Sequence, residues 1–248
     1  MKKKKSIKKI IIGIIIVIVI IIGIIAFTAV KELQEEDILK QEIINYSNKD
    51  LATDDYSIKV KTTGDRAYVE EAVKKYYKSL SDSVKAINSY LNDEELTNIL
   101  TIDSLRNDSP NYTKSHALIS NTKSKVTKEL KNISSLCEED TIKNLIDKDK
   151  LSDSEYYYDF YLNLMYTKKD LETLKSTKEQ METLSNNLNE FLDKVDEILT
   201  LLETNANYVE YTDTDIYISD DNILNEYNNL FDELTTLANN MANTENEI

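Results

Sequence analysis

A run of apolar residues near the beginning of the sequence constrains the protein more than any other feature. Residues 10–25 comprise twelve Ile, two Val and two Gly, and the uncharged run continues to residue 30. As a helix that rises about 1.5 Å per residue, residues 10–30 are about 31 Å long, which matches the hydrocarbon core of a bilayer. The sequence therefore predicts a transmembrane anchor at residues 10–30.

Charged residues on the two sides of this anchor predict its orientation. Six Lys lie within residues 1–9, whereas the first residues after the anchor are mainly acidic. Lys-rich flanks stay on the cytoplasmic side of a membrane. We therefore expect a single-pass protein of the cell membrane, with a cytoplasmic basic tail at residues 1–9 and an extracytoplasmic chain after residue 30. A cleaved signal peptide is the alternative, but its apolar core is shorter, about 7–15 residues, and ends in a small-x-small site.

The part of the chain after the anchor is strongly acidic and poor in residues that break helices. Residues 31–248 contain 24 basic and 45 acidic residues, a net charge of −21. This charge disfavours nucleic acid and anionic lipid as partners. The same residues contain one Gly and one Pro, which favours long helices over sheets with many turns. The abundance of Ile, Lys and Asn is typical of an AT-rich bacterial genome.

Apolar periodicity predicts how this part is organised. Residues 31–52 carry a loose apolar stripe and are expected to form a helical stalk, followed by an extracytoplasmic helical-bundle domain at residues 53–248. Within the domain, apolar residues recur at spacings of three and four over residues 65–91. This pattern predicts a core helix, and Asp65 is expected to cap it.

Further helices are predicted in the second half of the chain. Ser109 followed by Pro110 is a typical helix start, and this helix is expected to end near residue 137. A capping pattern at Ser152 opens a helical stretch that is expected to break near Thr167 and then to continue to residue 204. The longest helix carries a heptad repeat, with Leu174, Met181, Leu188, Val195 and Leu202 at one position and Leu184, Phe191 and Ile198 at another. A stripe this wide favours an antiparallel bundle over a free coiled coil.

Two segments predict a small β element. Residues 208–219 contain two β-prone runs separated by a short acidic turn, which predicts a hairpin. Residues 56–61 alternate apolar and polar side chains like a half-buried strand, and Gly64 ends this strand. We therefore expect a mainly α protein, in which an N-terminal transmembrane helix precedes an elongated antiparallel helical bundle with a β-hairpin or a three-stranded β element.

The sequence carries little catalytic or metal-binding chemistry. It contains one His and one Cys, so neither a His-based nor a Cys-based zinc site can be assembled. Motifs for a catalytic nucleophile or for phosphate binding are not present. We therefore expect no enzyme activity, no catalytic residue, no cofactor and no metal. His116 is expected to be a half-buried packing residue, with a proton-linked switch as the alternative, and Cys137 a buried thiol, with an intermolecular disulfide as the alternative.

Two acidic loops leave calcium binding open. Their carboxylates belong to Asp147, Asp149, Asp153 and Glu155 in one loop and to Asp213, Asp215, Asp220 and Asp221 in the other. Each loop lacks the Gly at position six of an EF-hand. Because Asp also caps helices and turns, we expect solvated loops, with calcium as the alternative.

A cluster of tyrosines is the candidate partner-binding site. It comprises Tyr156, Tyr157, Tyr158, Tyr161 and Tyr166. At about 100° per residue these side chains point all around a helix, so some of them leave the face that packs inward. Tyr combines an apolar ring with a hydroxyl, which suits contact with a protein partner. The alternative is packing in the core or at the edge of the bundle.

These observations favour a binding or structural role over a catalytic one. We expect a non-catalytic, membrane-anchored, extracytoplasmic helical protein that binds a protein partner in the bacterial cell envelope or forms a structural part of it. The alternative is an extracytoplasmic ligand-binding or sensor-type helical bundle. An enzyme would need a pocket in which two carboxylates face each other, because Asp and Glu are its only abundant acid–base groups.

Overall fold

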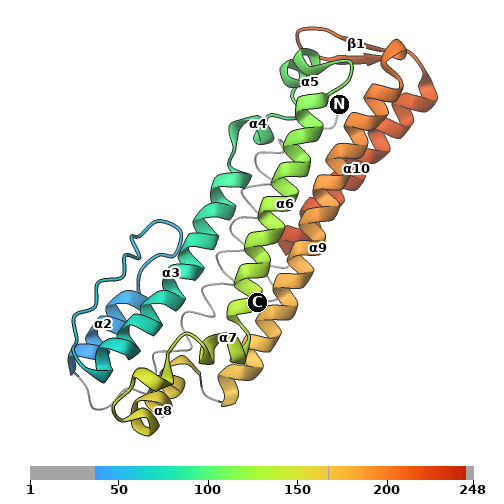
Figure 1. Cartoon of the computed structure of the whole chain (residues 1–248). Coiled ribbons are helices and arrows are strands. Elements are labelled where there is room, and N and C mark those ends of the chain that lie inside the picture. Colours follow the sequence, from blue (N-terminus) through green and yellow to red (C-terminus); the bar gives the residue numbers. More distant parts are fainter. Residues whose placement is uncertain (1–36, 167, 244–248) are drawn as a thin grey trace. The chain divides into compact units, whose positions relative to one another are not determined.

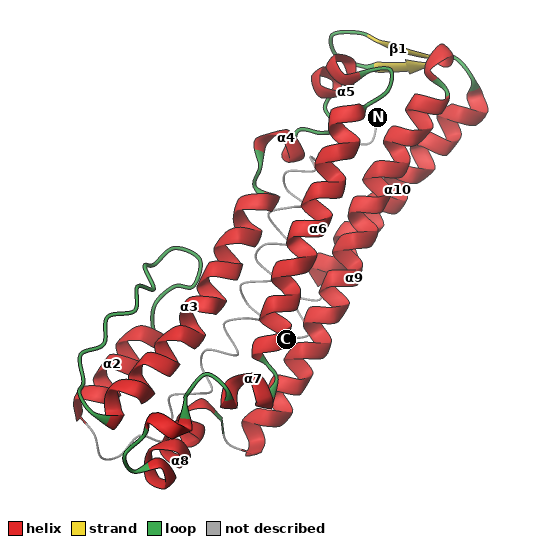
Figure 2. Cartoon of the chain, in the orientation of Figure 1, coloured by secondary structure: helices red, strands yellow, loops and turns green. Residues whose placement is uncertain are grey.

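The computed structural model describes residues 37–166 and 168–243, which fold mainly into helices with one small antiparallel sheet (Figure 1, Figure 2). The α-helices are α2 (Asp37–Ser47), α3 (Asp65–Leu91), α4 (Glu94–Thr97), α5 (Ile102–Asp108), α6 (Thr113–Leu136), α7 (Glu139–Lys143), α8 (Ser154–Met165), α9 (Lys168–Thr204) and α10 (Asp221–Asn243). Short 3₁₀ helices are η1 (Lys148–Lys150) and η2 (Ala206–Tyr208), and the strands are β1 (Val209–Tyr211) and β2 (Ile216–Ile218). The predicted mainly helical class and the predicted hairpin are confirmed.

The predicted membrane anchor falls outside this description. Residues 1–9 and 10–30, and the first six residues of the predicted stalk, are not among the described residues. Over residues 37–166 and 168–243, no helix has both the length and the hydropathy that crossing a bilayer requires.

The bounds of α3, the end of α8 and the buried face of α9 agree with the sequence pattern. α3 has the predicted bounds, 65–91, and α8 ends at Met165, close to the predicted break. All eight heptad positions of α9 are buried, namely Leu174, Met181, Leu184, Leu188, Phe191, Val195, Ile198 and Leu202. The apolar stripe therefore identified the packed face of α9 correctly.

The described chain divides into two units. Unit 1 contains residues 87–128 and 184–243, and unit 2 contains residues 37–86, 129–166 and 168–183. Helices α3, α6 and α9 contribute residues to both.

Unit 1 joins parts of α6 and α9, which run antiparallel, to α10 and the hairpin. As the residue number increases along α6, the number of its partner on α9 decreases, as expected for antiparallel helices. The contacts join His116 with Asp196 at 2.6 Å, Lys123 with Asp193 at 2.5 Å, and Thr127 with Asn189 at 3.1 Å. The ammonium group of Lys194 on α9 lies 2.9 Å from the carboxylate of Glu233 on α10. The hydroxyls of Tyr112 and Tyr211 contact each other and attach β1 to the residue that precedes α6. These contacts fix the hairpin and the helices as one unit.

Unit 2 contains α2, α7, α8 and parts of the three long helices. Residues 37–51, which belong to the predicted stalk, pack in this unit, since Leu39, Ile43 and Leu51 are buried there. The Ser81 hydroxyl on α3 donates to the carbonyl of Leu51 at 2.8 Å. Cys137, predicted to be a buried thiol, is buried, and burial raises the pKa of that thiol to about 12. A thiol in this setting is a packing group rather than a nucleophile.

The first residue of α3 has a different role from the one predicted. Instead of capping its own helix, Asp65 accepts hydrogen bonds from the backbone N–H groups of Ser152 and Asp153, each at 2.9 Å. These bonds hold the pKa of the Asp65 carboxyl below its ordinary value. The carboxylate thus connects the start of α3 to the start of α8.

The prediction of a third strand at residues 56–61 is wrong. Within the described residues the sheet has two strands, paired in the register Val209 with Ile218 and Tyr211 with Ile216. Residues 55–63 form neither helix nor strand, and Ile58 and Val60 are exposed instead of facing a core. The N–H of Lys59 donates to the carbonyl of Ser57 at 3.1 Å, which closes a tight turn around Ile58. The reason is that the backbone of residues 55–63 forms hydrogen bonds with side chains of α2 and α3 instead of with another strand.

The predicted start of α6 is also wrong. The helix begins at Thr113, after a turn in which the buried Tyr112 has a positive φ of 43°. The capping acceptor is Asp108, whose carboxylate receives the N–H groups of Lys114 at 3.3 Å and Ser115 at 2.8 Å. Asp108 performs the function that the sequence analysis assigned to Ser109, because a longer turn separates α5 from α6.

Candidate functional site

The five predicted site tyrosines divide into an exposed and a buried group. Tyr156 on α8 is 51% exposed, and Tyr157 and Tyr158 are half-buried. Tyr161 and Tyr166 are buried. One turn of α8 therefore presents aromatic side chains to solvent, whereas the next turn directs them into unit 2.

The two buried tyrosines have structural partners. The Tyr161 hydroxyl donates to the carbonyl of Ile142 in α7 at 2.7 Å, and burial raises the pKa of that phenol. The Tyr166 hydroxyl lies 3.5 Å from the carboxylate of Glu139. Tyr161 has no exposed area, so it is not available to a partner.

One exposed and two half-buried aromatic residues form an ordered surface, which we call the α8 surface and define as Tyr156, Tyr157 and Phe160. The Tyr156 ring stacks on the Phe160 ring with centroids 6.2 Å apart and meets Tyr157 edge-on at 4.9 Å. Asp153 fixes the start of this helix by accepting the N–H of Tyr156 at 3.2 Å. Residues at positions i and i+4 share a helix face, which is why Tyr156 and Phe160 meet.

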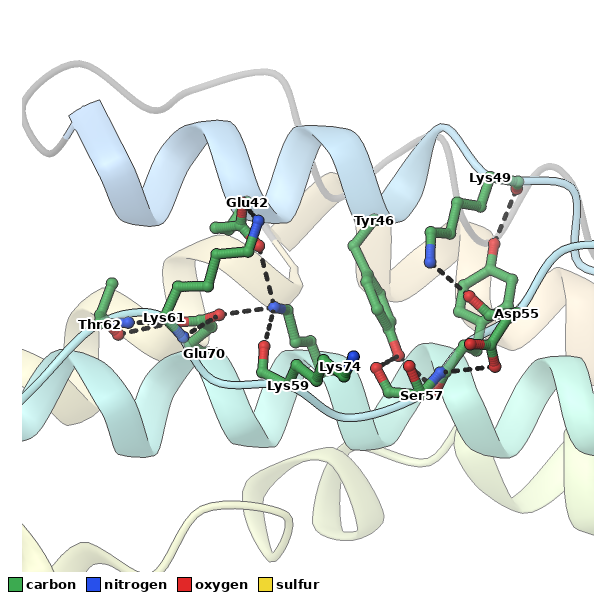
Figure 3. A network of polar contacts seen from close by, with 11 residues as sticks. Glu42, Tyr46, Lys49, Asp55, Ser57, Lys59, Lys61, Thr62, Glu70 and Lys74 are labelled. Carbon is green, nitrogen blue, oxygen red and sulfur yellow. Dashed lines mark hydrogen bonds and ion pairs between the residues drawn. The ribbon is translucent and has the colours of Figure 1, made fainter.

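A second feature, which the sequence analysis missed, is a set of polar contacts that anchors residues 55–63. We call these residues the tethered segment. Figure 3 shows it between α2 and α3, with the side chains of both helices directed at its backbone. Glu70 and Lys74, on successive turns of α3, are 0% and 2% exposed. Such burial of two ionised groups requires that each be fully paired.

Every donor of Lys74 has an acceptor. Its ammonium group donates to the carbonyl of Lys59 at 2.6 Å, to Glu70 at 2.6 Å and to Glu42 of α2 at 3.1 Å. It also lies 5.3 Å from the centre of the Tyr46 ring. Lys74 therefore joins α2, α3 and the tethered segment at one point.

Glu70 binds the tethered segment at Lys61 and Thr62, just after the residue that Lys74 binds. Its carboxylate accepts the N–H of Lys61 at 3.0 Å, the N–H of Thr62 at 2.8 Å and the Thr62 hydroxyl at 2.7 Å. Burial alone would raise the pKa of Glu70, but the hydrogen bonds from Lys74, Thr62 and Lys61 outweigh it and lower the pKa. Glu70 is therefore held as a carboxylate.

Two tyrosines secure the other end of the tethered segment. The Tyr46 hydroxyl donates to the carbonyl of Tyr56 at 2.5 Å, and the Tyr56 hydroxyl donates to the carbonyl of Lys49 at 2.7 Å. The two rings meet edge-on with centroids 4.9 Å apart. Burial, with smaller effects from Asp55 and Asp82, raises the pKa of Tyr46 to about 12. Both hydroxyls remain donors at any physiological pH.

His116 of unit 1 is half-buried, as predicted, and lies between two carboxylates of α9. Its Nδ1 is 2.6 Å from Asp196 and its Nε2 is 3.5 Å from Glu203. The sequence analysis missed these partners because their positions, 80 residues or more away, carry no local signal. The arrangement holds α6 against α9. Across the described residues, no group of three or more His, Cys, Asp or Glu is placed to hold a metal ion.

Several acidic residues considered as calcium ligands cap helices. Asp147 accepts the N–H of Asp149 at 3.2 Å at the start of η1, and Asp153 caps α8. Asp220 accepts the N–H groups of Asn222 and Ile223 at the start of α10. These contacts favour the predicted capping role.

Comparison with known proteins adds no functional assignment. The chain matches no protein-family model, no curated protein and no solved structure. Its function therefore has to be inferred from the residues described above.

Proposed function

We propose that this chain is a non-catalytic, single-pass membrane protein whose helical part lies outside the cytoplasm and binds a protein partner in the bacterial cell envelope. Residues 10–30 are the anchor, and the exported part as a whole is an antiparallel helical bundle. The antiparallel contacts of α6 with α9 in unit 1 support this architecture.

The observation that carries the proposal is the α8 surface. Aromatic residues supply much of the binding energy in protein interfaces, because they bury a large area and lose little side-chain entropy. Tyr156 is half exposed yet already ordered by its stacking on Phe160 and its edge contact with Tyr157. A surface ordered before binding pays less entropy when a partner arrives.

The buried ionic groups support a structural rather than a catalytic use of charge. Lys74 donates to three acceptors, and Glu70 accepts from three residues of unit 2. Groups saturated in this way exchange no proton with a substrate, because every polar atom already has a partner. Binding is therefore the function that these residues support best.

The first prediction concerns topology. Because residues 1–9 carry six Lys that stay in the cytoplasm, protease added to intact cells should remove the chain after residue 30. The measurement is an immunoblot with one antibody against residues 221–243 and a cytoplasmic protein as the control for cell integrity. If digestion required permeabilised cells, the extracytoplasmic location would be refuted.

The second prediction concerns the α8 surface. In the full chain, replacing Tyr156 and Tyr157 by Ala should reduce the amount of partner that is crosslinked on intact cells and recovered with the protein. The melting temperature should change little, because neither side chain is buried and substitutions at the surface typically cost about 0.5 kcal/mol or less.

The control is Tyr217→Ala, which removes a more exposed tyrosine, 59%, from unit 1. This variant should recover the partner as well as the unchanged chain does. Equal recovery by the Tyr156→Ala, Tyr157→Ala variant and the control would refute the role of the α8 surface.

A further inference from the structure

Exposed aliphatic side chains gather at one place in unit 2. Among the described residues, four large aliphatic side chains are exposed, and three of them are Ile38, Ile58 and Val60. Ile38, at 66%, is the most exposed large hydrophobic side chain of the described chain. It lies in the first turn of α2, whereas Ile58 and Val60 belong to the tethered segment. We call these three residues the aliphatic surface.

The contacts of Glu42 bring the start of α2 and the tethered segment together. Glu42 follows Ile38 by one turn, so the two side chains lie on one face of α2. The Glu42 carboxylate lies 2.7 Å from the ammonium group of Lys61 and 3.1 Å from that of Lys74. Lys74 in turn donates to the carbonyl of Lys59. The first turns of α2 therefore lie beside the tethered segment, as Figure 3 shows.

The tethered segment presents its two aliphatic residues on a fixed backbone. The N–H of Lys59 donates to the carbonyl of Ser57 at 3.1 Å, which places Ile58 at the tip of a tight turn. Side chains of α2 and α3 bind the backbone on both sides of this tip, at Tyr56 and at Lys59. Ile58 and Val60 are 37% and 39% exposed. Contact with another phase therefore requires little further ordering of the backbone.

The charge around the aliphatic surface differs from that of the chain as a whole. Residues 38–63 contain four Lys and four acidic residues, so their net charge is zero, whereas the net charge of the whole chain is −15. Glu42 is balanced by Lys61 and Lys74. Lys59 is exposed, and a Lys stem can cover apolar area while its ammonium group stays in water. This part of unit 2 is therefore not repelled by a lipid surface without net charge.

The predicted anchor indicates which surface the aliphatic residues meet. It ends at residue 30, and α2 begins at Asp37. Seven residue steps span about 25 Å at most, so the start of α2 stays within that distance of the bilayer. A tethered group acts at a high effective concentration, so a weak affinity is enough to keep it bound.

We propose that the aliphatic surface rests on the bilayer that holds the anchor, with Ile38, Ile58 and Val60 in the interfacial layer. Apolar side chains at a lipid–water interface contribute binding free energy in proportion to the area that they bury. The contact holds unit 2 to the membrane at a second point besides the anchor. This inference rests on the anchor of the proposed function, but it does not involve the α8 surface.

Tryptophan fluorescence of the full chain in vesicles tests this contact. The chain contains no Trp, so one introduced Trp reports on one position. The Ile58→Trp variant is reconstituted in phosphatidylcholine, a lipid without net charge, with or without bromine on the acyl chains. Bromine quenches Trp fluorescence only at contact distance. The emission of this variant should shift to shorter wavelength in the vesicles and should be quenched by the brominated lipid.

Two further single-Trp variants separate this contact from the anchor. Phe27→Trp lies in the predicted anchor and should be quenched wherever unit 2 lies. Tyr217→Trp lies on the hairpin of unit 1, where Tyr217 is 59% exposed, and should not be quenched. If Phe27→Trp is quenched but Ile58→Trp and Tyr217→Trp behave alike, the contact is refuted and the anchor stands. If Phe27→Trp is not quenched, the anchor and the contact both fail.

Removing the rest of the aliphatic surface shows whether the introduced Trp enters the lipid by itself. Adding Ile38→Ser and Val60→Ser to the Ile58→Trp variant should reduce the quenching, while the helical circular dichroism stays unchanged because both positions are exposed. Undiminished quenching would mean that the indole, rather than the aliphatic surface, binds the lipid, and would also overturn the proposal.

Discussion

Replacing Lys74 by Ala should lower the free energy of unfolding of the protein by about 3–5 kcal/mol, because it leaves a buried charge without its partner. The carboxylate of Glu70 is 0% exposed and lies 2.6 Å from the Lys74 ammonium group. Without Lys74, Glu70 stays buried with its negative charge uncompensated, and the carbonyl of Lys59 loses its donor as well. The substitution should also release the tethered segment, which depends on both groups.

The adjacent ion pair on α3 provides a matched control. Lys75 lies 2.8 Å from Glu71 with the same i, i+4 spacing, but these side chains are 47% and 40% exposed. Exposed pairs of this kind contribute about 0.2–1 kcal/mol, so Lys75→Ala should have a small effect. Urea unfolding of both variants, followed by helical circular dichroism, measures the difference. A similar loss of stability in the two variants would show that Lys74 has no special role.

This pair of contacts also shows what limits prediction from the sequence. Residues 70–75 read Glu-Glu-Ala-Val-Lys-Lys, in which Glu70–Lys74 and Glu71–Lys75 are identical as patterns and both are typical of a solvated helix face. The structure buries one pair and exposes the other. A weak signal was present, since Glu70 and Lys74 continue the line of Tyr77, Ser81 and Val84 along α3, and all three are buried. Because two of the five residues are charged, the apolar pattern alone did not reveal the line.

Where the apolar pattern was uninterrupted, prediction succeeded. The bounds of α3, the buried face of α9 and the hairpin at residues 208–219 all follow from local spacing, which a helix or strand translates directly into burial. The tethered segment has the same alternation as a strand, yet its bonding partners are side chains of α2 and α3, and alternation does not specify the partner. Residues 56–61 were therefore assigned to a sheet that does not include them.

The tyrosines of α8 illustrate the same limit for the candidate site. The spacing of Tyr156, Tyr157, Tyr158 and Tyr161 predicted that some would be exposed, but not which. The deciding signal lies farther along the helix. Leu164 and Met165 follow Tyr161 by three and four residues and are buried, so Tyr161 belongs to their stripe and Tyr156 does not.

That division predicts a large difference in stability between two tyrosine substitutions. Tyr161→Ala should lower the free energy of unfolding by about 3–5 kcal/mol, since it leaves a cavity the size of a buried aromatic ring. Tyr161→Phe retains the ring but removes the hydrogen bond of the hydroxyl to the carbonyl of Ile142, which should cost about 0.5–1.5 kcal/mol. The cost is no larger because that carbonyl still accepts the N–H of Leu145 at 3.2 Å. Tyr156→Ala should have little effect, because Tyr156 is already half exposed.

Measuring these three variants alongside partner recovery separates packing from binding. If Tyr161 is a packing residue, Tyr161→Phe recovers the partner fully, and the Ala variant fails only under conditions in which it unfolds. Tyr156→Ala should show the reverse, with a stable fold and reduced recovery. A stable Tyr161→Ala variant that lost its partner would instead place Tyr161 in the contact surface, which its complete burial in unit 2 argues against. The comparison thus tests whether the tyrosines of one short helix serve two purposes, with the exposed turn binding and the buried turn holding α8 to α7.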